Sequence, residues 1–444
     1  MESVGRLDAD LLVIGGGMAG LTVAAAAAQR GACVALVERS GALGGSAALS
    51  QGLVWTRADE ADFLADDPEG DLGLFRVVRA ELPAVIEWIA GLGVGLGGSH
   101  PFGVGREVDV PAFVRRVSRL VESNGGFVVY ETTPTRLLVE DGRVVGASLS
   151  DRAGGEQGDV RVPATVLATG GFQASPELRR DFLFEGAEAL AVRSNRHSDG
   201  GGLRLGVDVG AGLTAHTTGF YGHLIPYPMA SFAEADFVPL AQYQSTHAVL
   251  VDLRGERFCD ESRGDYVNNQ EVARRGRALL VVDRSVRERF AGYGAGVPDD
   301  RMTAAGRAGA HLVEAGSLDE LAHAVRAWGY DGDRLAHTVS AYNRLVAAGG
   351  GGPAGAVPRT GNRIPVAVPP FAAVEVQAAI TATFGGLRID LDGRVLDGGG
   401  VPIDGLYAAG ADAGGFNVYG YAGGLGVGAV VARRIAAGLV PRAA

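Results

Sequence analysis

Glycines and one carboxylate near the start of the chain are the residues whose types and spacing point most directly to chemistry. Residues 15–20 read GGGMAG, follow a short apolar run at 9–14 and precede the alanine-rich stretch 21–30. A second apolar run, at 33–37, ends at Glu38. A strand, a glycine turn, a helix and a second strand ending in an acid form the βαβ unit typical of a dinucleotide site. We therefore expect a pyrophosphate at the helix N-terminus and a ribose hydroxyl on Glu38.

Each glycine in this turn has its own expected role. Gly15 permits the tight turn, Gly17 lets the backbone approach the pyrophosphate, and Gly20 lets the helix pack closely on the strand. Small residues recur soon afterwards, at 44–46 and 50–52. Turns of this kind suit a long cofactor that lies over several loops, so the sequence favours FAD over NAD.

The same strand-and-glycine pattern returns later in the chain. Residues 160–168 predict a strand that runs into Thr169-Gly170-Gly171, and residues 405–412 and 421–427 resume the pattern near the C-terminus. A glycine-rich turn that opens a last helix at about residue 426 would provide a second helix N-terminus. Its partial positive charge suits the negative charge that develops on a flavin during reduction.

A change in composition suggests how the domains are arranged. Residues 214–345 hold six of the eight histidines and many aromatic residues, and residues 348–360 are rich in glycine and proline. We expect an α/β fold with a Rossmann-like domain at residues 1–213 and 359–444, a domain inserted at residues 214–358, and a flexible link at residues 348–360.

Overall composition excludes several classes of protein. Hydrophobic residues make up 47% and charged residues 20%, as in a soluble globular chain. Lysine is absent, which excludes Schiff-base chemistry and a P-loop lysine. A net charge of −11 argues against nucleic acid or an anionic membrane as the partner. The longest apolar run, residues 21–28, is far shorter than the roughly 20 residues that span a bilayer, so we expect no transmembrane segment.

The cysteines and the N-terminal residues bear on location and metal binding. Cys33 and Cys259 lie far apart and show no metal-ligand spacing, which indicates free thiols in a reducing compartment and no metal site. The first ten residues are polar and acidic and lack the layout of a signal peptide. We therefore expect a cytoplasmic protein.

With these blocks in hand, the chain resembles the superfamily of FAD-dependent fumarate reductases, succinate dehydrogenases and 3-ketosteroid dehydrogenases. The resemblance covers nearly the whole length and rests on ordered blocks, which are VIGGGMAGL with GGSAALSQG, VLATGGF, SDGGGLRLG, GERFCDE, TFGGLRID, GLYAAGAD and YAGGLG. It implies a discontinuous FAD-binding domain, residues 1–213 and 359–444, interrupted by an α+β capping domain at residues 214–358 that takes up the substrate.

The resemblance also implies how FAD is held. The matching positions are Gly15, Gly17, Ala19, Gly20, Glu38, Arg39, Gly44, Gly45, Ser46, Gly52, Ala168, Gly170, Asp199, Gly410, Asp412, Gly426 and Val427. Members with covalent flavin carry a histidine just after the GG pair. Here the sequence continues Ser46-Ala47-Ala48, so we expect non-covalent FAD.

Two departures separate this chain from the dicarboxylate branch of the superfamily. Tyr421 stands about where that branch has a substrate-binding arginine, and Ala382 stands about where it has a histidine. A dicarboxylate would lose its charge-assisted hydrogen bonds. The pattern is closest to the ketosteroid dehydrogenases, in which this tyrosine helps to polarise the substrate ketone. Tyr419, two residues earlier, is a further candidate for substrate contact.

The proton-transfer group is open between two residues. Ketosteroid dehydrogenases keep a basic tyrosine shortly after an F-x-N-E block, which residues 258–261 match, and Tyr266 lies one position beyond the expected spacing. Tyrosine has an ordinary pKa near ~10, so Tyr266 would need a strong field such as that of Arg263. Arg263 is itself the rival, because fumarate reductases use a nearby arginine as proton donor. His223 and His247 could donate hydrogen bonds to a substrate, although a structural role is the more ordinary interpretation.

These patterns predict an FAD-dependent oxidoreductase that adds or removes hydrogen across a C–C bond next to a carbonyl. The predicted substrate is a neutral, apolar ketone or enone, and the electron acceptor or donor is unknown. One alternative is a fumarate reductase-like or tricarballylate dehydrogenase-like enzyme that acts on a carboxylate. An alternative of another class is a flavin-binding subunit that transfers electrons within a complex.

Overall fold

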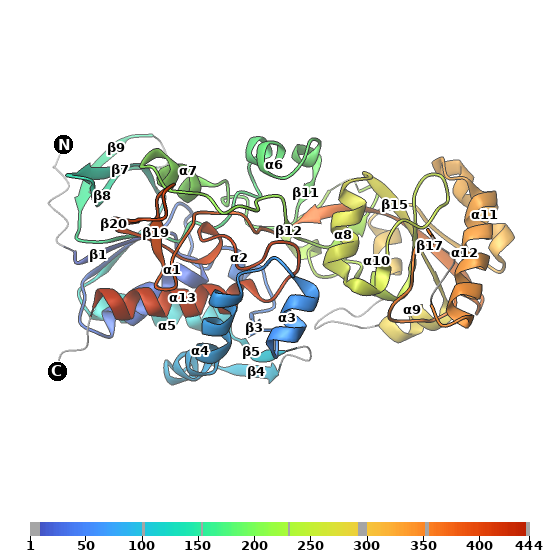
Figure 1. The fold of residues 1–444 in the computed structure, drawn as a ribbon, viewed down its shortest axis with the longest axis horizontal. Helices are drawn as coiled ribbons and strands as arrows, with labels where there is room; N and C mark the ends of the chain where they lie inside the picture. The colour runs from blue at the N-terminus through green and yellow to red at the C-terminus, as the bar shows by residue number, and fades with distance from the viewer. Residues whose placement is uncertain are drawn as a thin grey trace. The chain divides into compact units, whose positions relative to one another are not determined.

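The computed structural model describes residues 9–99, 103–151, 154–229, 231–291, 300–350 and 355–440. Its chain divides into two compact units. Unit 1 comprises residues 1–188, 194–220 and 382–444, and unit 2 comprises residues 189–193 and 221–381. Figure 1 shows both units as mixtures of helices and strands.

Unit 1 is built on a six-stranded sheet with the order β19-β20-β10-β1-β2-β6. Its strands are β1 (Leu11–Ile14), β2 (Val34–Val37), β6 (Phe127–Val129), β10 (Thr165–Leu167), β19 (Arg394–Leu396) and β20 (Pro402–Ala408). All neighbouring pairs are parallel except β19 with β20. Strands β1 and β2 are buried throughout, as strands of a parallel sheet covered on both faces must be. The expected α/β fold with a Rossmann-like domain is confirmed.

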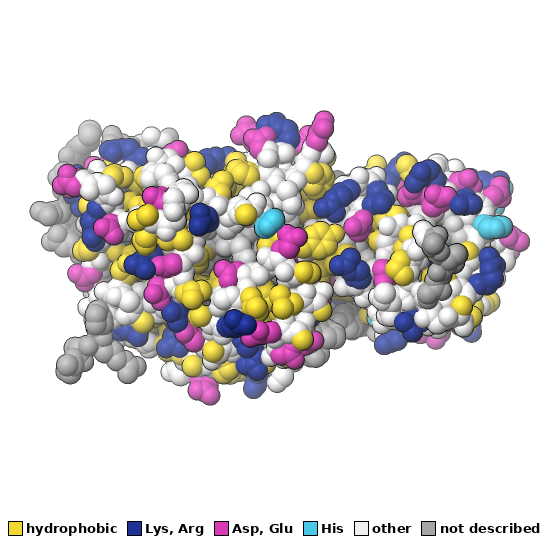
Figure 2. Space-filling view, viewed as in Figure 1, with side chains coloured by type: hydrophobic (Ala, Val, Ile, Leu, Met, Phe, Trp, Pro, Cys, Tyr) yellow, Lys and Arg dark blue, Asp and Glu magenta, His cyan; other side chains and the backbone are white. Residues whose placement is uncertain are grey.

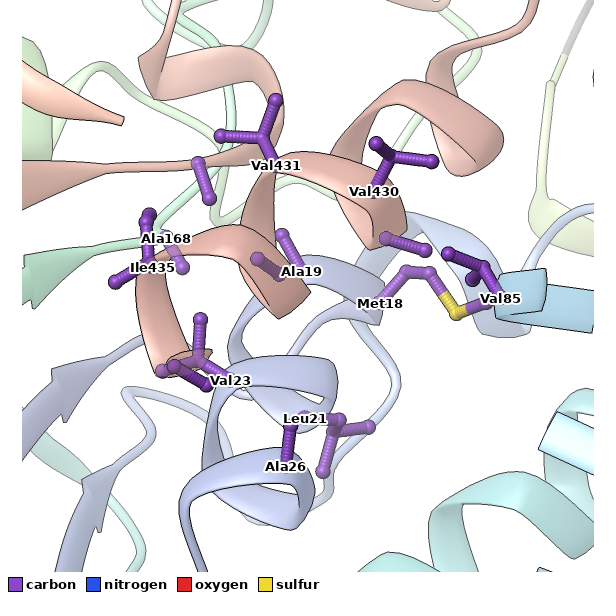
Figure 3. Packing of buried hydrophobic residues seen from close by; sticks show 14 of the residues in the cluster. Met18, Ala19, Leu21, Val23, Ala26, Val85, Ala168, Val430, Val431 and Ile435 are labelled. Carbon is purple, nitrogen blue, oxygen red and sulfur yellow. The ribbon is translucent and has the colours of Figure 1, made fainter. Parts of the chain in front are cut away.

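Two helices from opposite ends of the chain pack against each other beside this sheet. They are α1 (Met18–Ala28) and α13 (Gly424–Leu439). Every residue of α1 is buried, which explains its run of alanines, since small side chains let two helix backbones approach closely. Figure 3 shows Val431 and Ile435 of α13 beside Ala19 and Val23 of α1. This packing binds the first and last segments of the chain into one core.

Smaller sheets complete unit 1. One contains β3 (Leu53–Thr56), β4 (Leu96–Ser99) and β5 (Val104–Val108), and the other contains β7 (Thr132–Glu140), β8 (Arg143–Asp151) and β9 (Glu156–Arg161). The predicted single strand over 160–168 is wrong. The chain leaves the second small sheet at Arg161 and enters the large sheet at Thr165, with Pro163 between them. Proline has no backbone N–H for a sheet ladder, so a break there is expected.

Helices α4 (Leu72–Gly91) and α5 (Val110–Ser123) pack into the same core of unit 1. No helix within the described ranges is both long and apolar enough to cross a membrane.

Unit 2 is a sheet between two layers of helices. The central strand β17 (Phe371–Ile380) pairs with β11 (Ala191–Val192), β13 (Leu224–Pro226), β15 (Arg277–Asp283) and β16 (Leu312–Ala315), and β14 (Val249–Val251) pairs with β15. Alternate residues of β15 enter different cores, as the two-residue repeat of a strand requires. Helices α11 (Leu318–Val325) and α12 (Gly332–Ala347) cover one face, and α8 (Asp265–Ala273), α9 (Arg284–Phe290) and α10 (Arg301–Arg307) cover the other (Figure 1).

The boundaries of unit 2 differ from the expected capping domain of residues 214–358. Its last strand, β17, is the centre of its sheet, so the unit extends to Thr381. The segment expected to be a flexible link contains Arg359, which is fully buried and forms an ion pair with the buried Glu261 (2.8 Å). The described part of that segment therefore belongs to unit 2; residues 351–354 lie outside the described residues, as do residues 1–8.

The surface agrees with the composition of the chain. On the face that Figure 2 shows, basic and acidic side chains are interspersed, and none of the basic side chains is lysine. Mixed charge of this kind gives no broad positive footprint for nucleic acid on that face.

Candidate active site

The turn from β1 into α1 has the geometry that a dinucleotide needs. Gly15 has φ +107°, and a Cβ there would lie 2.2 Å from the carbonyl oxygen of Ala168, so only glycine fits. A Cβ on Gly20 would lie 1.9 Å from the carbonyl oxygen of Gly15, which keeps α1 tight against β1. Gly17 differs, because nothing lies within 4 Å of its Cβ position. The N-terminus of α1, with its unpaired amides and partial positive charge, therefore faces open space.

Glu38 follows β2 and holds this turn in place. It is 7% exposed, and its Oε2 accepts the N–H of Gly16 (2.8 Å). Its Oε1 accepts the N–H (2.8 Å) and the hydroxyl (2.9 Å) of Ser40. A carboxylate offers roughly four lone-pair positions, so these three bonds leave room for a hydroxyl donor.

A buried carboxyl lies where the strands β10 and β20 end. Asp412 is 1% exposed and accepts hydrogen bonds from the backbone N–H and the hydroxyl of Thr169. The same hydroxyl accepts the N–H of Gly202 (2.9 Å). Burial raises the pKa of Asp412 to about 7, against the lowering effect of its hydrogen bonds from Thr169 and Gly170. The carboxyl ends of parallel strands are the usual place for a ligand in such a sheet.

The loop that precedes α13 is clamped by one carboxylate. Asp67 is 1% exposed and accepts the backbone N–H groups of Val418 (2.7 Å) and Tyr419 (3.0 Å). Burial raises the pKa of Asp67, and the backbone hydrogen bonds oppose that shift. Asn417 accepts the N–H of Ala422 (2.9 Å) through its side-chain oxygen. The backbone around Tyr419 and Tyr421 is therefore fixed before α13 begins.

Tyr421 caps the helix that follows it. Its hydroxyl accepts the N–H of Gly424, the first residue of α13, at 3.1 Å. The ring lies edge-on to Trp55, with ring centroids 6.0 Å apart, and parallel to the ring of Phe384 at 6.4 Å. Burial raises the pKa of the Tyr421 phenol, so it stays protonated at neutral pH. Tyr419 is half-buried and lies two residues away on the same clamped loop.

An arginine that sequence reasoning missed lies beside Tyr421. Arg57 follows β3, donates to the backbone carbonyl of Tyr421 (3.4 Å) and forms an ion pair with Asp66. Its guanidinium also lies over the ring of Trp55, 5.3 Å from the centroid. The Nε of Arg57 is buried and has no hydrogen-bond partner among the described residues. A cation is therefore present in this region, with its charge paired to a neighbouring carboxylate.

The candidates for proton transfer lie in unit 2. Tyr266 is in the first turn of α8 and is 8% exposed, with its ring against Gly264. Arg263 ends the short 3₁₀ turn Glu261–Arg263 and is exposed. Glu261, from the same block, is fully buried between Arg257 and Arg359, so the block holds unit 2 together through this charge cluster.

Unit 2 also contains a polar chain centred on a histidine. His223 is 5% exposed; its Nδ1 lies 2.6 Å from Oδ2 of Asp265, and its Nε2 lies 2.8 Å from the hydroxyl of Tyr221. Burial lowers the pKa of His223, Asp265 opposes this shift, and the positive charges of Arg193 and Arg301 add to it. His223 therefore has a polar partner on each ring nitrogen.

Comparison with known proteins identifies the family. The family model described as FAD binding domain matches residues 97–427, and one described as FAD dependent oxidoreductase matches residues 10–171. The chain belongs to the FAD binding domain family. It is an FAD-dependent oxidoreductase that acts on C–C bonds, and the resemblance to the fumarate reductase and ketosteroid dehydrogenase superfamily is confirmed.

Relatives of this oxidoreductase have different substrates. A vinyl phenol reductase of Lactiplantibacillus plantarum is 25% identical over 455 residues, which cover 91% of this chain and 90% of the relative. A urocanate reductase of Eggerthella lenta is 26% identical, covering 92% of this chain and 70% of the relative. A 3-oxosteroid 1-dehydrogenase of Mycolicibacterium smegmatis is 24% identical, covering 71% and 58%. Reductases and a dehydrogenase are both represented, so these comparisons leave the substrate open.

The residues of unit 1 fit FAD. The space beside Gly17 suits a pyrophosphate, and Glu38 has room for a ribose hydroxyl. A buried polar atom also lacks a partner: Gln173 is 2% exposed and donates to Ser194 (3.0 Å), but its Oε1 has no partner among the described residues. Ser194 in turn lies 3.3 Å from Ser46, hydroxyl to hydroxyl, so a donor on the cofactor near these residues would satisfy Gln173.

The structure places all the predicted FAD positions in unit 1, at the ends of its strands and the starts of its helices. Gly15, Gly17, Ala19 and Gly20 lie at the β1–α1 turn, Glu38 and Arg39 after β2, Gly44, Gly45 and Ser46 at α2 (Gly45–Ala48), Ala168 and Gly170 after β10, Asp199 before α7 (Gly201–Asp208), Gly410 and Asp412 after β20, and Gly426 and Val427 in α13. Arg39 and Asp199 form an ion pair with each other (2.7 Å). Gly52 differs, since a Cβ there would meet the carbonyl oxygen of Val108 at 2.2 Å, which is a structural constraint.

No group of three His, Cys, Asp or Glu side chains in the described part of the chain could hold a metal ion.

Proposed function

We propose that this oxidoreductase adds or removes hydrogen across a C–C bond next to the carbonyl of a neutral, apolar ketone or enone. The observation that carries the proposal is the Tyr421 hydroxyl, which accepts the N–H of Gly424 at 3.1 Å. A phenol hydroxyl is both a donor and an acceptor of hydrogen bonds. Because burial raises its pKa, this phenol keeps its proton as a hydrogen-bond donor, and it brings no positive charge to pair with a carboxylate.

Bound FAD supplies the hydride acceptor or donor for such a reaction. Tyr421 donates a hydrogen bond to the substrate carbonyl and stabilises the negative charge that develops on its oxygen. Asp67 fixes the loop and so holds the hydroxyl in position. Predicted roles remain for Tyr419, as a second substrate contact, and for Tyr266 or Arg263, as the group that moves the proton at the neighbouring carbon.

A carboxylate substrate is the second candidate, and Arg57 favours it. Its guanidinium is next to Tyr421, and its buried Nε has no partner among the described residues. Arginine is the side chain best suited to bind a carboxylate through two parallel hydrogen bonds. Its ion pair with Asp66 favours the neutral substrate, because that carboxylate already neutralises the charge.

An anaerobic experiment distinguishes the two candidates. The oxidised holoenzyme is mixed with a panel of cyclic ketones and a panel of dicarboxylates, and loss of flavin absorbance is followed. We expect bleaching by a ketone and a roughly 10²–10³-fold slower rate in Tyr421→Phe, as for loss of one oxyanion donor. Tyr407→Phe, on β20, is the matched control and should keep the rate. Bleaching by dicarboxylates alone, abolished in Arg57→Met, would replace this proposal with the second candidate.

Other parts of the proposal concern the cofactor, the partner and the location. We propose that FAD is bound non-covalently, so that acid precipitation should release all of it into the supernatant. An external electron carrier completes the cycle. The two free cysteines, Cys33 and Cys259, fit a reducing cytoplasm.

A further inference from the structure

We infer that Tyr221, His223 and Asp265 form a proton relay, in which Tyr221 exchanges the proton with the substrate carbon. This inference rests on the proposed function and takes the place of Tyr266 or Arg263 in it. All three residues belong to unit 2, and none was predicted from sequence as a proton-transfer group.

The hydrogen bonds give the relay a direction. A carboxylate only accepts, so the 2.6 Å contact between Asp265 and Nδ1 of His223 places the ring proton on Nδ1. The Nε2 of the neutral ring then accepts the hydroxyl proton of Tyr221 at 2.8 Å. Asp265 is itself held by the N–H of Tyr266 (2.9 Å) at the start of α8. The acid orients the base and the base contacts the hydroxyl, as in a Ser-His-Asp triad with tyrosine in place of serine.

The electrostatics keep the imidazole of His223 in its neutral form. Burial and the charges of Arg193 and Arg301 lower the pKa of His223, so the ring is neutral at neutral pH. Arg193 is fixed by the carbonyl of Phe237 (2.8 Å) and the hydroxyl of Thr381 (3.2 Å).

The two outer residues of this hydrogen-bonded series, Tyr221 and Asp265, are more exposed to solvent than the central His223. The side chain of His223 is 6% exposed and that of Asp265 is 22% exposed, while Tyr221 is partly buried. Asp265 can therefore exchange protons with water, and the buried ring passes them on.

Along the chain, residues next to the relay contact Tyr421 and the predicted FAD position Ser46. Thr381 donates its N–H to the carbonyl of Tyr221 (2.7 Å), and three residues later Phe384 stacks on Tyr421. Arg193 is followed directly by Ser194, whose hydroxyl lies 3.3 Å from that of Ser46.

In the dehydrogenation direction, the C–H bond next to the carbonyl breaks and its proton moves to the Tyr221 oxygen. The hydroxyl proton of Tyr221 moves at the same time to Nε2 of His223. The electron pair left on carbon forms the double bond as a hydride leaves the next carbon for FAD, the two-electron oxidant. Asp265 neutralises the imidazolium and passes the extra proton to water. In the reduction direction each transfer is reversed.

Three variants of the holoenzyme test the relay. Tyr221→Phe removes the hydroxyl, His223→Gln keeps a hydrogen-bonding amide that cannot take a proton, and Asp265→Asn removes the charge. We expect each to bind FAD and to bleach with dithionite, but to bleach with substrate roughly 10²–10⁴-fold more slowly, the range for general acid–base catalysis. Tyr342→Phe, which loses a buried hydroxyl bonded to the carbonyl of Ile364 (2.8 Å), is the control and should keep the wild-type rate.

A second readout does not depend on turnover. In the ¹H–¹⁵N spectrum of histidine-labelled wild-type protein, the Nδ1 proton of His223 should be strongly deshielded, and Asp265→Asn should abolish that signal. Wild-type bleaching rates in Tyr221→Phe and His223→Gln, or no deshielded proton in the wild type, would overturn the relay. Absence of bleaching with every ketone and dicarboxylate in the wild type would instead overturn the proposed function, so the two failures are distinguishable.

Discussion

The buried carboxyl of Asp412 should make the stability of unit 1 depend on pH. It is 1% exposed, and burial raises its pKa to about 7, whereas an aspartate in an unfolded chain titrates near ~3.9. A group whose pKa is raised by folding stabilises the protein below its unfolded pKa, and that contribution is lost as the pH rises through the folded pKa. A gap of about 3 units corresponds to about 4 kcal/mol of unfolding free energy lost between roughly pH 4 and pH 7.

Urea unfolding of the flavin-free protein at pH 5 and pH 8 measures this loss. A Trp328→Phe background limits the fluorescence signal to Trp55 and Trp88, which both belong to unit 1. Asp412→Asn mimics the neutral form: its amide oxygen can accept the N–H of Thr169, and its amide NH2 can donate to the Thr169 hydroxyl. Between pH 5 and pH 8 the unfolding free energy of this variant should therefore fall by about 3 kcal/mol less than that of the wild type. The exposed carboxylate of β20 offers a control, because Asp404→Asn should leave the dependence unchanged. Equal pH slopes for the wild type and Asp412→Asn would refute the reasoning.

Two other predictions concern the nucleotide turn and the buried ion pair of unit 2. Gly17→Ala should weaken FAD binding at least tenfold in a fluorescence titration while changing the apoprotein's stability by about 1 kcal/mol or less, because its Cβ meets open space at a helix cap. Gly20→Ala should lower both the FAD affinity and the stability of the apoprotein, because its Cβ would lie 1.9 Å from the Gly15 oxygen. Equal stability of the Gly17→Ala and Gly20→Ala variants would contradict this account. Arg359→Met should destabilise unit 2 by about 3–5 kcal/mol in urea unfolding followed at its single tryptophan, because Glu261 loses one of its buried cations. A loss below about 1 kcal/mol would show that Arg257 alone neutralises Glu261.

The nucleotide half of the fold could be predicted because its signals are local. Strand, glycine turn and helix at 11–28 follow one another within a few residues, and the geometry at Gly15 and Gly20 depends on the backbone next to them. Binding of FAD by the chain follows from its family, whereas the individual contacts of the assigned positions stay predictions.

The errors arise where a distant part of the chain decides the structure. Residues 160–168 are apolar enough for one strand, but Val160 pairs with β8 and Thr165 pairs with β1, so the segment divides at Pro163. The glycine-rich stretch before Arg359 has the composition of a linker. Nothing in that composition reveals that this arginine will meet Glu261, which lies 98 residues earlier, in the core of unit 2.

The polar chain of unit 2 shows most clearly why a catalytic centre is harder to find from sequence than a cofactor site. A dinucleotide imposes spacing on consecutive residues, since its phosphates bind backbone amides at a turn. A proton relay imposes distances between side chains only. His223 and Asp265 satisfy this requirement 42 residues apart because α8 packs against the sheet to which β13 belongs. What the sequence does offer is Tyr221 and His223 at i and i+2 just before a buried strand. That spacing places both side chains on one side of extended backbone and could have directed attention to this pair before the neighbouring acid was known.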